Sequence, residues 1–314
     1  MTATQRILVV IDPTARSQPA LERGVWLAKR LSAAVELFIC AYDPHLENRD
    51  FVDPASVDKA RASLLENHTR RLRELATHAK AEGLIVNVDA RWDYPLHEGI
   101  VRKTLDCGAD IVLKDTHYHS VLKRSIFSNT DWNLIRTSPA NLWLVKPRAA
   151  GVRPSIVAAV DPLHERDKPA ELDHRILEIA QELSSGLGGD LNIFHSFDIA
   201  PVLAVSTNSM TMPISLPIQE LTESLKKEHA EALYALTDAH AIDRKSVHMH
   251  QGGTRELLVA FAEQIRADLV VMGAVSRRGM QRLFLGNTAE EVLDKLDCDV
   301  LIVKPNCFET DAHS

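Results

Sequence analysis

The chain has 314 residues, of which 45% are hydrophobic and 25% charged, a composition typical of folded globular proteins and not of disordered or membrane-embedded chains. This length is about twice that of an average domain, so it predicts two domains. The formal net charge of -7 disfavours binding to nucleic acid or to anionic membrane surfaces.

The cysteines and the N-terminal region indicate a reducing compartment. The four cysteines have no metal-ligand spacing and are too few for a disulfide framework. The first apolar run, residues 7–11, ends at Asp12 and is too short for a secretion signal. No run approaches the roughly 20 apolar residues that span a bilayer. We therefore expect a cytoplasmic protein without a membrane span.

Short β-branched runs alternate with helical patterns along the whole chain. In chain order the predicted strands are residues 7–11, 35–40, 85–90, 111–113 and 142–145, followed by 156–160, 191–194, 246–250, 269–272 and 300–303. Nearly continuous apolar runs suit strands that are buried on both faces. The alternation predicts an α/β fold with two open, five-stranded, parallel, doubly wound sheets. Ligands of such sheets bind beyond the carboxyl ends of the strands.

The two halves are copies of one another. A displacement of 158 residues relates three pairs of landmarks: Asp110 and Asp268, Asn129 and Asn287, and Lys146 and Lys304. Asp12-Pro13 and Asp161-Pro162 correspond at a displacement of 149, so the second copy contains an insertion. Small and polar residues between Pro147 and Pro154 indicate a linker. We place the two domains at residues 1–148 and 153–314.

Asp12 and Asp161 follow the first strand of each copy and are candidate ligand contacts. A carboxylate at this point can accept hydrogen bonds from the ribose or base of a ligand. It can equally cap the loop that follows. Position alone leaves both roles open.

The loop after the fourth strand of the second copy has the character of a phosphate site. It contains Gly273, Ser276, Gly279 and Gly286, and it leads into a helix that begins near Asn287 and Thr288. Glycines let backbone N–H groups approach an anion, and a helix N-terminus adds positive potential. Asn287 is expected to cap that helix, with Glu290 three residues on. A capped helix after a glycine turn also occurs in proteins that bind nothing, so a purely structural role remains open.

With these motifs in place, nearly the whole chain resembles the universal stress protein family, in particular its tandem members of the UspE type. The resemblance implies an adenine nucleotide alpha hydrolase-like fold. Nucleotide-binding members carry a Gly, two residues, Gly, nine residues, Gly, Ser/Thr loop that holds the phosphates of ATP. The matching positions here are Gly273, Ser276, Gly286 and Asn287, of which Ser276 and Asn287 depart from the pattern.

The resemblance implies that the second domain binds ATP or another adenine nucleotide, with Mg²⁺ as a companion ion. Asp161 would then contact the adenosine, and the phosphates would lie among Gly273, Ser276, Gly279, Gly286, Asn287 and Thr288. The expected role is nucleotide-dependent signalling in a stress response. A slow ATPase is one alternative, although no P-loop, nucleophile elbow or other catalytic motif is present. A scaffold with a vestigial nucleotide loop is another.

The first copy lacks the glycines of this loop. The displacement of 158 places Asp115, Tyr118 and Ser128 at their positions, so side chains are expected to crowd the loop. We therefore expect that the first domain does not bind ATP in the family manner, and that it serves for packing or binds a different ligand. The resemblance also implies that strands 142–145 and 300–303 pair within the chain as a pseudo-dimer, and it leaves room for a homodimer.

Two further features have open roles. The histidine pairs His117/His119 and His248/His250 suit either a metal, with a third ligand such as His195 after the second strand, or ordinary surface positions. The uncharged segment 202–217 is either a packing flap or the mouth of a pocket for an apolar small molecule near Met210–Leu216.

Overall fold

The computed structural model describes residues 4–47, 53–119, 124–149, 151–163, 171–200, 218–273, 275–276, 284–285 and 287–305. Of residues 117–119, 124–126, 275–276, 284–285, 287–288 and 290, only the backbone is described. The chain divides into two compact units, one up to residue 150 and one from Gly151 to Pro305. Each unit is described by itself.

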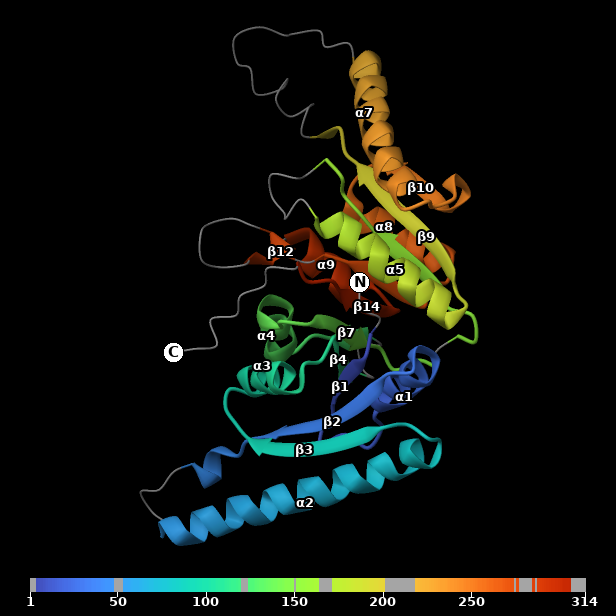
Figure 1. Ribbon diagram of the computed structural model, residues 1–314. Helices are drawn as coiled ribbons and strands as arrows, with labels where there is room; N and C mark the ends of the chain where they lie inside the picture. Colours follow the sequence, from blue (N-terminus) through green and yellow to red (C-terminus); the bar gives the residue numbers. More distant parts are fainter. Residues whose placement is uncertain are drawn as a thin grey trace, which may run out of the picture. The chain divides into compact units, whose positions relative to one another are not determined.

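The first unit alternates strands and helices (Figure 1). Its elements are β1 (Arg6–Val10), α1 (Pro19–Leu31), β2 (Ala34–Ala41), η1 (Pro44–Leu46), α2 (Pro54–Ala81), β3 (Val86–Trp92), α3 (Leu96–Cys107), β4 (Ile111–Asp115), β5 (His117–His119), β6 (Arg124–Ile126), α4 (Asn129–Thr137) and β7 (Asn141–Val145). The main sheet has the order β7-β4-β1-β2-β3, and all of these pairs are parallel.

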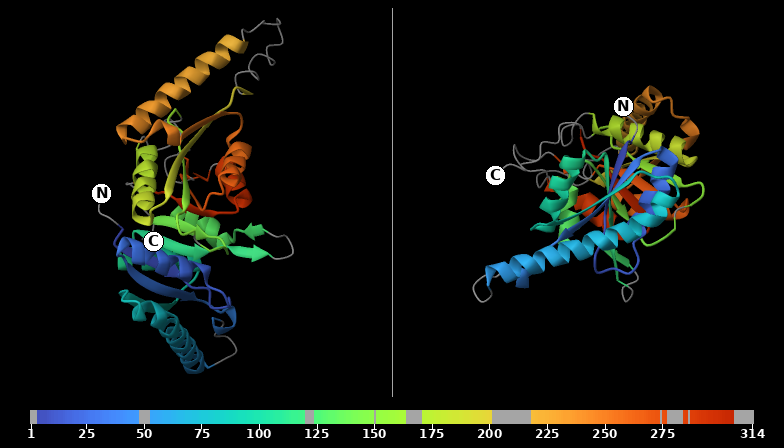
Figure 2. Two further views of the ribbon diagram at one scale, coloured as in Figure 1. Left: turned by 90° about the vertical axis from the view of Figure 1, so that its right-hand side faces the viewer. Right: turned by 60° about the horizontal axis from the view of Figure 1, so that its bottom comes forward.

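Helices cover the first sheet as the chain pattern requires. Helices α3 and α4 lie together on one side of the sheet and α1 lies on the other (Figure 1). The long helix α2 packs along β3 and β2 (Figure 2). The central strand β1 contributes Ile7, Leu8 and Val9, all 0% exposed, which explains why its apolar run is continuous.

The second unit repeats this architecture. Its elements are β8 (Ser155–Ala159), α5 (Leu172–Leu187), β9 (Asp190–Phe197), α7 (Ile218–Ala239), η2 (Arg244–Ser246), β10 (Val247–Gln251), α8 (Thr254–Gln264), β11 (Leu269–Met272), β12 (Val275–Ser276), β13 (Phe284–Leu285), α9 (Asn287–Lys295) and β14 (Asp299–Ile302). The main sheet has the order β10-β9-β8-β11-β14, again with parallel pairs. The predicted α/β fold with two parallel doubly wound sheets is therefore confirmed.

Two predictions about association are not tested by the structure of the separate units. They are the pairing of strands 142–145 and 300–303 and the formation of a homodimer. Segment 202–217, with its proposed flap or apolar pocket, lies outside the described residues. Within the part of the chain that the structure describes, no helix has both the length and the apolar character needed to cross a membrane.

A buried ion cluster fastens α3 to the first sheet. The Lys103 Nζ lies 2.6 Å from Glu36 Oε1 on β2 and 2.8 Å from Asp89 Oδ2 on β3. The side chains of Lys103 and Glu36 are only 7% and 8% exposed. Burial lowers the pKa of Lys103, but the hydrogen bonds to Asp89 and Glu36 outweigh it, and the net shift is upward. Burial raises the pKa of Asp89, but Lys103 outweighs it, and the net shift is downward.

Candidate functional site

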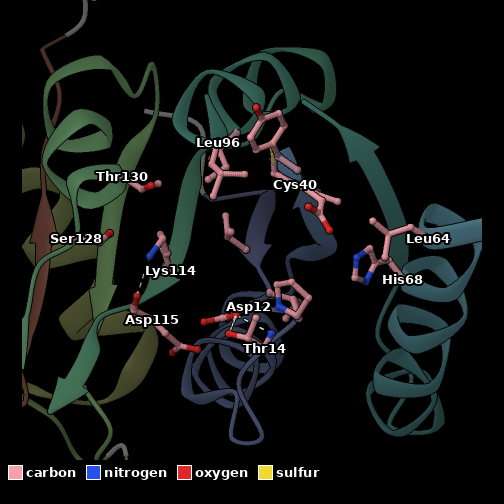
Figure 3. A pocket seen from close by; sticks show the side chains of 17 residues that line it. Asp12, Thr14, Cys40, Leu64, His68, Leu96, Lys114, Asp115, Ser128 and Thr130 are labelled. Atoms are coloured by element: carbon pink, nitrogen blue, oxygen red, sulfur yellow. Dashed lines mark hydrogen bonds between the residues drawn. The ribbon is translucent and has the colours of Figure 1, made fainter. Parts of the chain in front are cut away.

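A cavity of about 550 Å³ opens in the first unit where β1, β2 and β4 end (Figure 3). Strand β1 lies between β2 and β4, so the cavity is at the point where the chain reverses its direction across the sheet. The ends of these strands and the loops after them supply Asp12, Pro13, Thr14, Tyr42, Asp43, Lys114 and Asp115. Leu64 and His68 of α2 form the opposite wall (Figure 3).

Asp12 has one of the two roles that the sequence left open, that of a loop cap, and its role as a ligand contact stays a prediction. Its Oδ1 accepts hydrogen bonds from the backbone N–H of Thr14 at 2.7 Å and from the Thr14 hydroxyl at 2.6 Å. These bonds hold the loop after β1 in a turn. The same side chain also lines the cavity. Asp12 is therefore a loop cap placed where a ligand can reach it.

The start of α4 carries its own anion. Ser128 caps the helix and its Oγ accepts from the Asp131 N–H at 3.2 Å, while Asp131 Oδ2 accepts from the Ser128 N–H at 2.7 Å and from the Ser128 hydroxyl at 2.8 Å. Asp131 is 0% exposed. The Lys114 Nζ, from β4, lies 2.7 Å from Asp131 Oδ1. A carboxylate thus occupies the position where a helix N-terminus attracts a phosphate.

Asp115 joins the end of β4 to the beginning of α1. Its Oδ1 accepts a hydrogen bond of 2.6 Å from the backbone N–H of Ala20. Asp115 and Ser128 replace two of the loop glycines, and both line the cavity without filling it. The crowding expected from these replacements therefore leaves a cavity of about 550 Å³. The side chain of Tyr118, the third replacement, lies outside the described part.

Three titratable groups around the cavity have shifted pKa values. Burial, and then the charge of Asp93, raises the pKa of the Cys40 thiol to about 12, so the nucleophilic thiolate is scarce at neutral pH. A hydrogen bond to the Glu47 carboxylate raises the pKa of Tyr42 to about 12. Burial, and then nearby Arg71, lowers the pKa of His68, which keeps the imidazole uncharged at neutral pH.

Sequence reasoning missed Lys114 and Asp131, although two signals point to them. Ser128 and Asp131 have the spacing of a capping box, which marks a self-sufficient helix N-terminus. Lys114 is a cation at the end of an otherwise apolar strand, which indicates a buried or half-buried counterion.

The second unit has no charged residue at the equivalents of these positions. The displacement of 158 places Met272 opposite Lys114, Gly273 opposite Asp115, Gly286 opposite Ser128 and Ala289 opposite Asp131. Met272 and Ala289 are each 7% exposed. The four residues that build an internal anion site in the first copy are therefore all neutral in the second.

Packing explains why a glycine stands at position 273, a reason that the sequence did not reveal. A Cβ built on Gly273 would lie 2.7 Å from Leu172 Cδ2, at the first residue of α5. This contact corresponds to the one between Asp115 and Ala20 in the first unit, because both join the end of the fourth strand to the start of the first helix. The glycine is needed here for close approach of α5, whatever binds beyond it.

The helix predicted to be capped by Asn287 starts one residue earlier than expected. Asn287 is itself the first residue of α9 and not the residue before the helix. The third helical position is Ala289 and not Glu290, so the expected capping box is wrong. Gly279, Gly286 and the side chains of Ser276, Asn287 and Thr288 lie outside what the structure describes.

Each unit carries a short antiparallel pair after its fourth strand, which the sequence did not predict. Strand β12 pairs with β13 in the second unit, and β5 pairs with β6 in the first. Ser276 lies opposite Phe284 in this pair. The predicted phosphate loop therefore begins as an antiparallel arm and not as an open turn.

Asp161 follows β8, and its backbone N–H donates to Asp173 Oδ1 of α5 at 3.3 Å. A buried histidine lies close by on the next strand. The Nδ1 of His195 lies 3.0 Å from the carbonyl oxygen of Val160, and its Nε2 lies 2.8 Å from the Nδ1 of His229 on α7. Burial lowers the pKa of His195, so the ring is neutral and donates from Nδ1 to the carbonyl oxygen.

The arrangement of histidines in the second unit does not converge on one point. His195 lies within β9 and not after it, because β9 extends to Phe197. The register places His195 beside Met249, so its side chain shares a face with Met249 and opposes His248 and His250. Among the described residues, no three His, Cys, Asp or Glu side chains are grouped to hold a metal ion.

The comparisons with known proteins agree with this duplicated architecture. The family model described as "Universal stress protein family" matches residues 3–146 and 155–304, so the chain belongs to the universal stress protein family. It is a tandem member of the UspE type. It is similar to Universal stress protein E of Photorhabdus laumondii, with 29% identity over 314 residues, 98% of each chain. Universal stress protein E of Escherichia coli K12 is also 29% identical, covering 99% of this chain and 97% of its own.

Solved structures show the same fold over the full length. A functionally unknown protein from Pseudomonas aeruginosa PAO1 has a TM-score of 0.76 at 24% identity, covering 98% of this chain and 94% of its own. A universal stress protein from Archaeoglobus fulgidus has a TM-score of 0.67 at 16% identity, covering 96% and 99%.

Proposed function

We propose that this chain is a cytoplasmic stress-response protein whose second domain binds an adenine nucleotide, ATP with Mg²⁺, and signals through a change in conformation or association. Membership of the universal stress protein family supports this class of function. The observation that carries the choice of domain is the neutral set Met272, Gly273, Gly286 and Ala289, which stands where the first domain has its internal ion pair and cap.

This difference matters because a helix N-terminus has a fixed positive potential. Its first N–H groups lack partners within the helix and favour an anion. In the first unit, Asp131 supplies that anion from within the chain. In the second, Ala289 cannot, and the residue before the helix is Gly286, which adds no side chain. A phosphate group is the ligand chemistry that fits such a helix start.

The adenosine end of the ligand is assigned by position. Asp161 follows β8 at the carboxyl end of the sheet, as Asp12 follows β1 beside the cavity of the first unit. His195 lies on the neighbouring strand, and its pKa is sensitive to the charge of Asp161. A polar surface formed by half-buried Asp161 and buried His195 can accept hydrogen bonds from a ribose or a base, and the glycine loop is assigned to the phosphates.

A pair of equivalent tryptophan substitutions tests the proposal. G286W inserts an indole at the start of α9, and S128W inserts the same group at the matching position of the first unit. We expect full-length G286W to lose ATP binding in isothermal titration calorimetry, whereas S128W keeps the affinity of the natural chain. Mass spectrometry of small molecules released from freshly purified protein should also detect an adenine nucleotide in the natural chain and not in G286W.

Two results would refute this assignment. The first is ATP affinity that is unchanged in folded G286W and lost in S128W, which would place the nucleotide in the first unit. The second is no binding of ATP up to millimolar concentration by the natural chain, together with no co-purified nucleotide, which would leave a scaffold role.

A further inference from the structure

We infer that the cavity at the carboxyl ends of β1, β2 and β4 is a second ligand site, which accepts a small organic cation and rejects phosphate-bearing ligands. This site is separate from the nucleotide site proposed for the second unit. The inference depends on three features of the first unit: an occupied anion position, an excess of carboxylates on the cavity wall, and an apolar space of suitable size.

The anion position is occupied by the chain itself. The Asp131 carboxylate accepts two hydrogen bonds from Ser128 and an ion pair from Lys114, and it is fully buried. A phosphate would have to displace it from the Ser128 N–H and compete for the same ammonium group. Two anions this close repel each other strongly where water is excluded. The cavity is therefore closed to phosphate by charge and not by volume.

The wall of the cavity carries more negative than positive charge. Asp12, Asp43 and Asp115 contribute three carboxylates. Among the described residues that line the cavity, Lys114 is the one lysine or arginine, and Asp131 pairs with its ammonium at 2.7 Å. Such a wall attracts a cation and repels an anion.

Two further described groups near the wall, His68 and Arg71, add no positive charge that faces the cavity. Burial lowers the pKa of His68, which leaves it neutral at pH 7. Arg71 donates to the carbonyl oxygens of Pro13 and Ala15, the latter at 2.8 Å, and so is held on the backbone of the loop after β1.

The rest of the wall suits the apolar body of a ligand. Val10, Ile11, Leu64, Leu96 and Ile100 line the cavity. Tyr42 adds an aromatic wall, which is supported by stacking on Tyr94 with ring centroids 4.1 Å apart. A volume of about 550 Å³ accommodates a ring-bearing amine. Aromatic and carboxylate groups together are the usual surroundings of organic ammonium ligands.

Three probes that share one indole ring test the charge preference directly. Tryptamine, tryptophol and indole-3-propionate differ at the end of a two-carbon chain, which carries an ammonium, a hydroxyl or a carboxylate. We expect the full-length protein to bind tryptamine most tightly, tryptophol more weakly and indole-3-propionate at least about tenfold more weakly than tryptamine, which corresponds to about 1.4 kcal/mol. Calorimetric titration measures all three affinities.

The variant D131N should reverse the preference. The amide oxygen can still accept from the Ser128 N–H, but the counterion of Lys114 is lost. The cavity then gains one unpaired ammonium, so indole-3-propionate is expected to bind more tightly than in the natural chain and tryptamine at least about tenfold more weakly. Retention of the natural circular dichroism spectrum and melting temperature within a few degrees shows that the fold is intact.

A second variant keeps the test valid if D131N fails to fold. D43N removes a carboxylate from the cavity mouth and retains the side-chain oxygen that accepts from the His45 N–H at 2.9 Å. It should weaken tryptamine binding and leave tryptophol unchanged. G286W, the nucleotide-site variant, should alter none of these affinities.

Three outcomes overturn the inference. The first is equal or tighter binding of indole-3-propionate than of tryptamine to the natural chain. The second is an unchanged order of affinities in folded D131N or an unchanged tryptamine affinity in folded D43N. The third is no detectable binding of any of the three indoles at millimolar concentration. None of these outcomes bears on ATP binding by the second unit, so the two proposals fail independently.

Discussion

A carboxylate placed at residue 289 should strongly weaken phosphate binding in the second unit. Ala289 is the third residue of α9, the position that Asp131 holds in α4, and it is 7% exposed. In the first unit the Asp131 carboxylate reaches the backbone N–H before the helix, with a distance of 2.7 Å to the Ser128 nitrogen. An aspartate at residue 289 would reach the corresponding N–H of Gly286, which is where a phosphate oxygen is expected.

The magnitude follows from this geometry. A phosphate that shares these N–H groups would lie about 5 Å from the new carboxylate, and two unit charges at that distance repel by about 3 kcal/mol at an effective dielectric constant of about 20. The variant A289D is therefore expected to bind ATP roughly 150-fold more weakly than the natural chain. A289N has nearly the same shape without the charge and should lose much less affinity.

Calorimetric titration of ATP, with circular dichroism as a check of folding, measures this effect. The double variant M272K/A289D rebuilds the internal ion pair of the first unit, so it should fold at least as well as A289D while its ATP affinity remains low. An affinity of folded A289D within about threefold of the natural value would refute the reasoning, because the ligand phosphates would then lie elsewhere.

Two further substitutions probe packing. K103M leaves the Glu36 carboxylate buried without its partner and should lower the free energy of unfolding by about 3–5 kcal/mol, whereas E36L/K103M should recover most of the loss in urea denaturation. The upward pKa shift of Lys103 predicts that this stability is lost as the pH rises above about 10.4. The downward pKa shift of Asp89 predicts that it is also lost as the pH falls below about 3.9. If the stability of the natural chain varied with pH in the same way as that of K103M, the assignment would be contradicted. G273A should destabilise the second unit by about 1–3 kcal/mol because the added methyl group clashes with Leu172. In the double variant G273A/L172A the loss of stability should be smaller than the sum of the losses in the two single variants. Fully additive losses would show that Leu172 is not the reason for the glycine.

The fold could be predicted because its signals are local and repeated. Strands buried on both faces require continuous apolar runs, and the run 7–11 corresponds to β1 with its fully buried centre. The duplication at a displacement of 158 adds independent support, since the same landmarks recur in the same order. The errors were small shifts of strand boundaries, such as the extension of β9 to Phe197, which places His195 inside a strand, and the two short antiparallel pairs that the sequence did not predict.

The candidate site could be predicted only in position. The carboxyl ends of the strands were expected to form it, and Asp12, Asp115 and Ser128 do meet there. The loss of the glycines predicted that side chains would fill the loop. Whether a side chain fills a cavity depends on the group to which it hydrogen-bonds. Asp115 accepts a hydrogen bond from Ala20 at the start of α1, so it does not fill the cavity. That contact joins residues 95 positions apart, so no local pattern reveals it.

One difference in chemistry explains how two copies of a fold can serve different ligands. The positive potential at the start of the last helix is a property of the backbone, so both copies have it whatever their sequences. The first copy satisfies it with Asp131, which stabilises the start of α4 without any ligand. The second copy has Gly286 and Ala289 instead, so the phosphate of the nucleotide proposed for this unit would add stability there. At a free concentration about 100 times its Kd, a ligand contributes about 2.7 kcal/mol to the unit that binds it. If the second unit binds a nucleotide as proposed, the nucleotide concentration is expected to change the stability of that unit and not of the first.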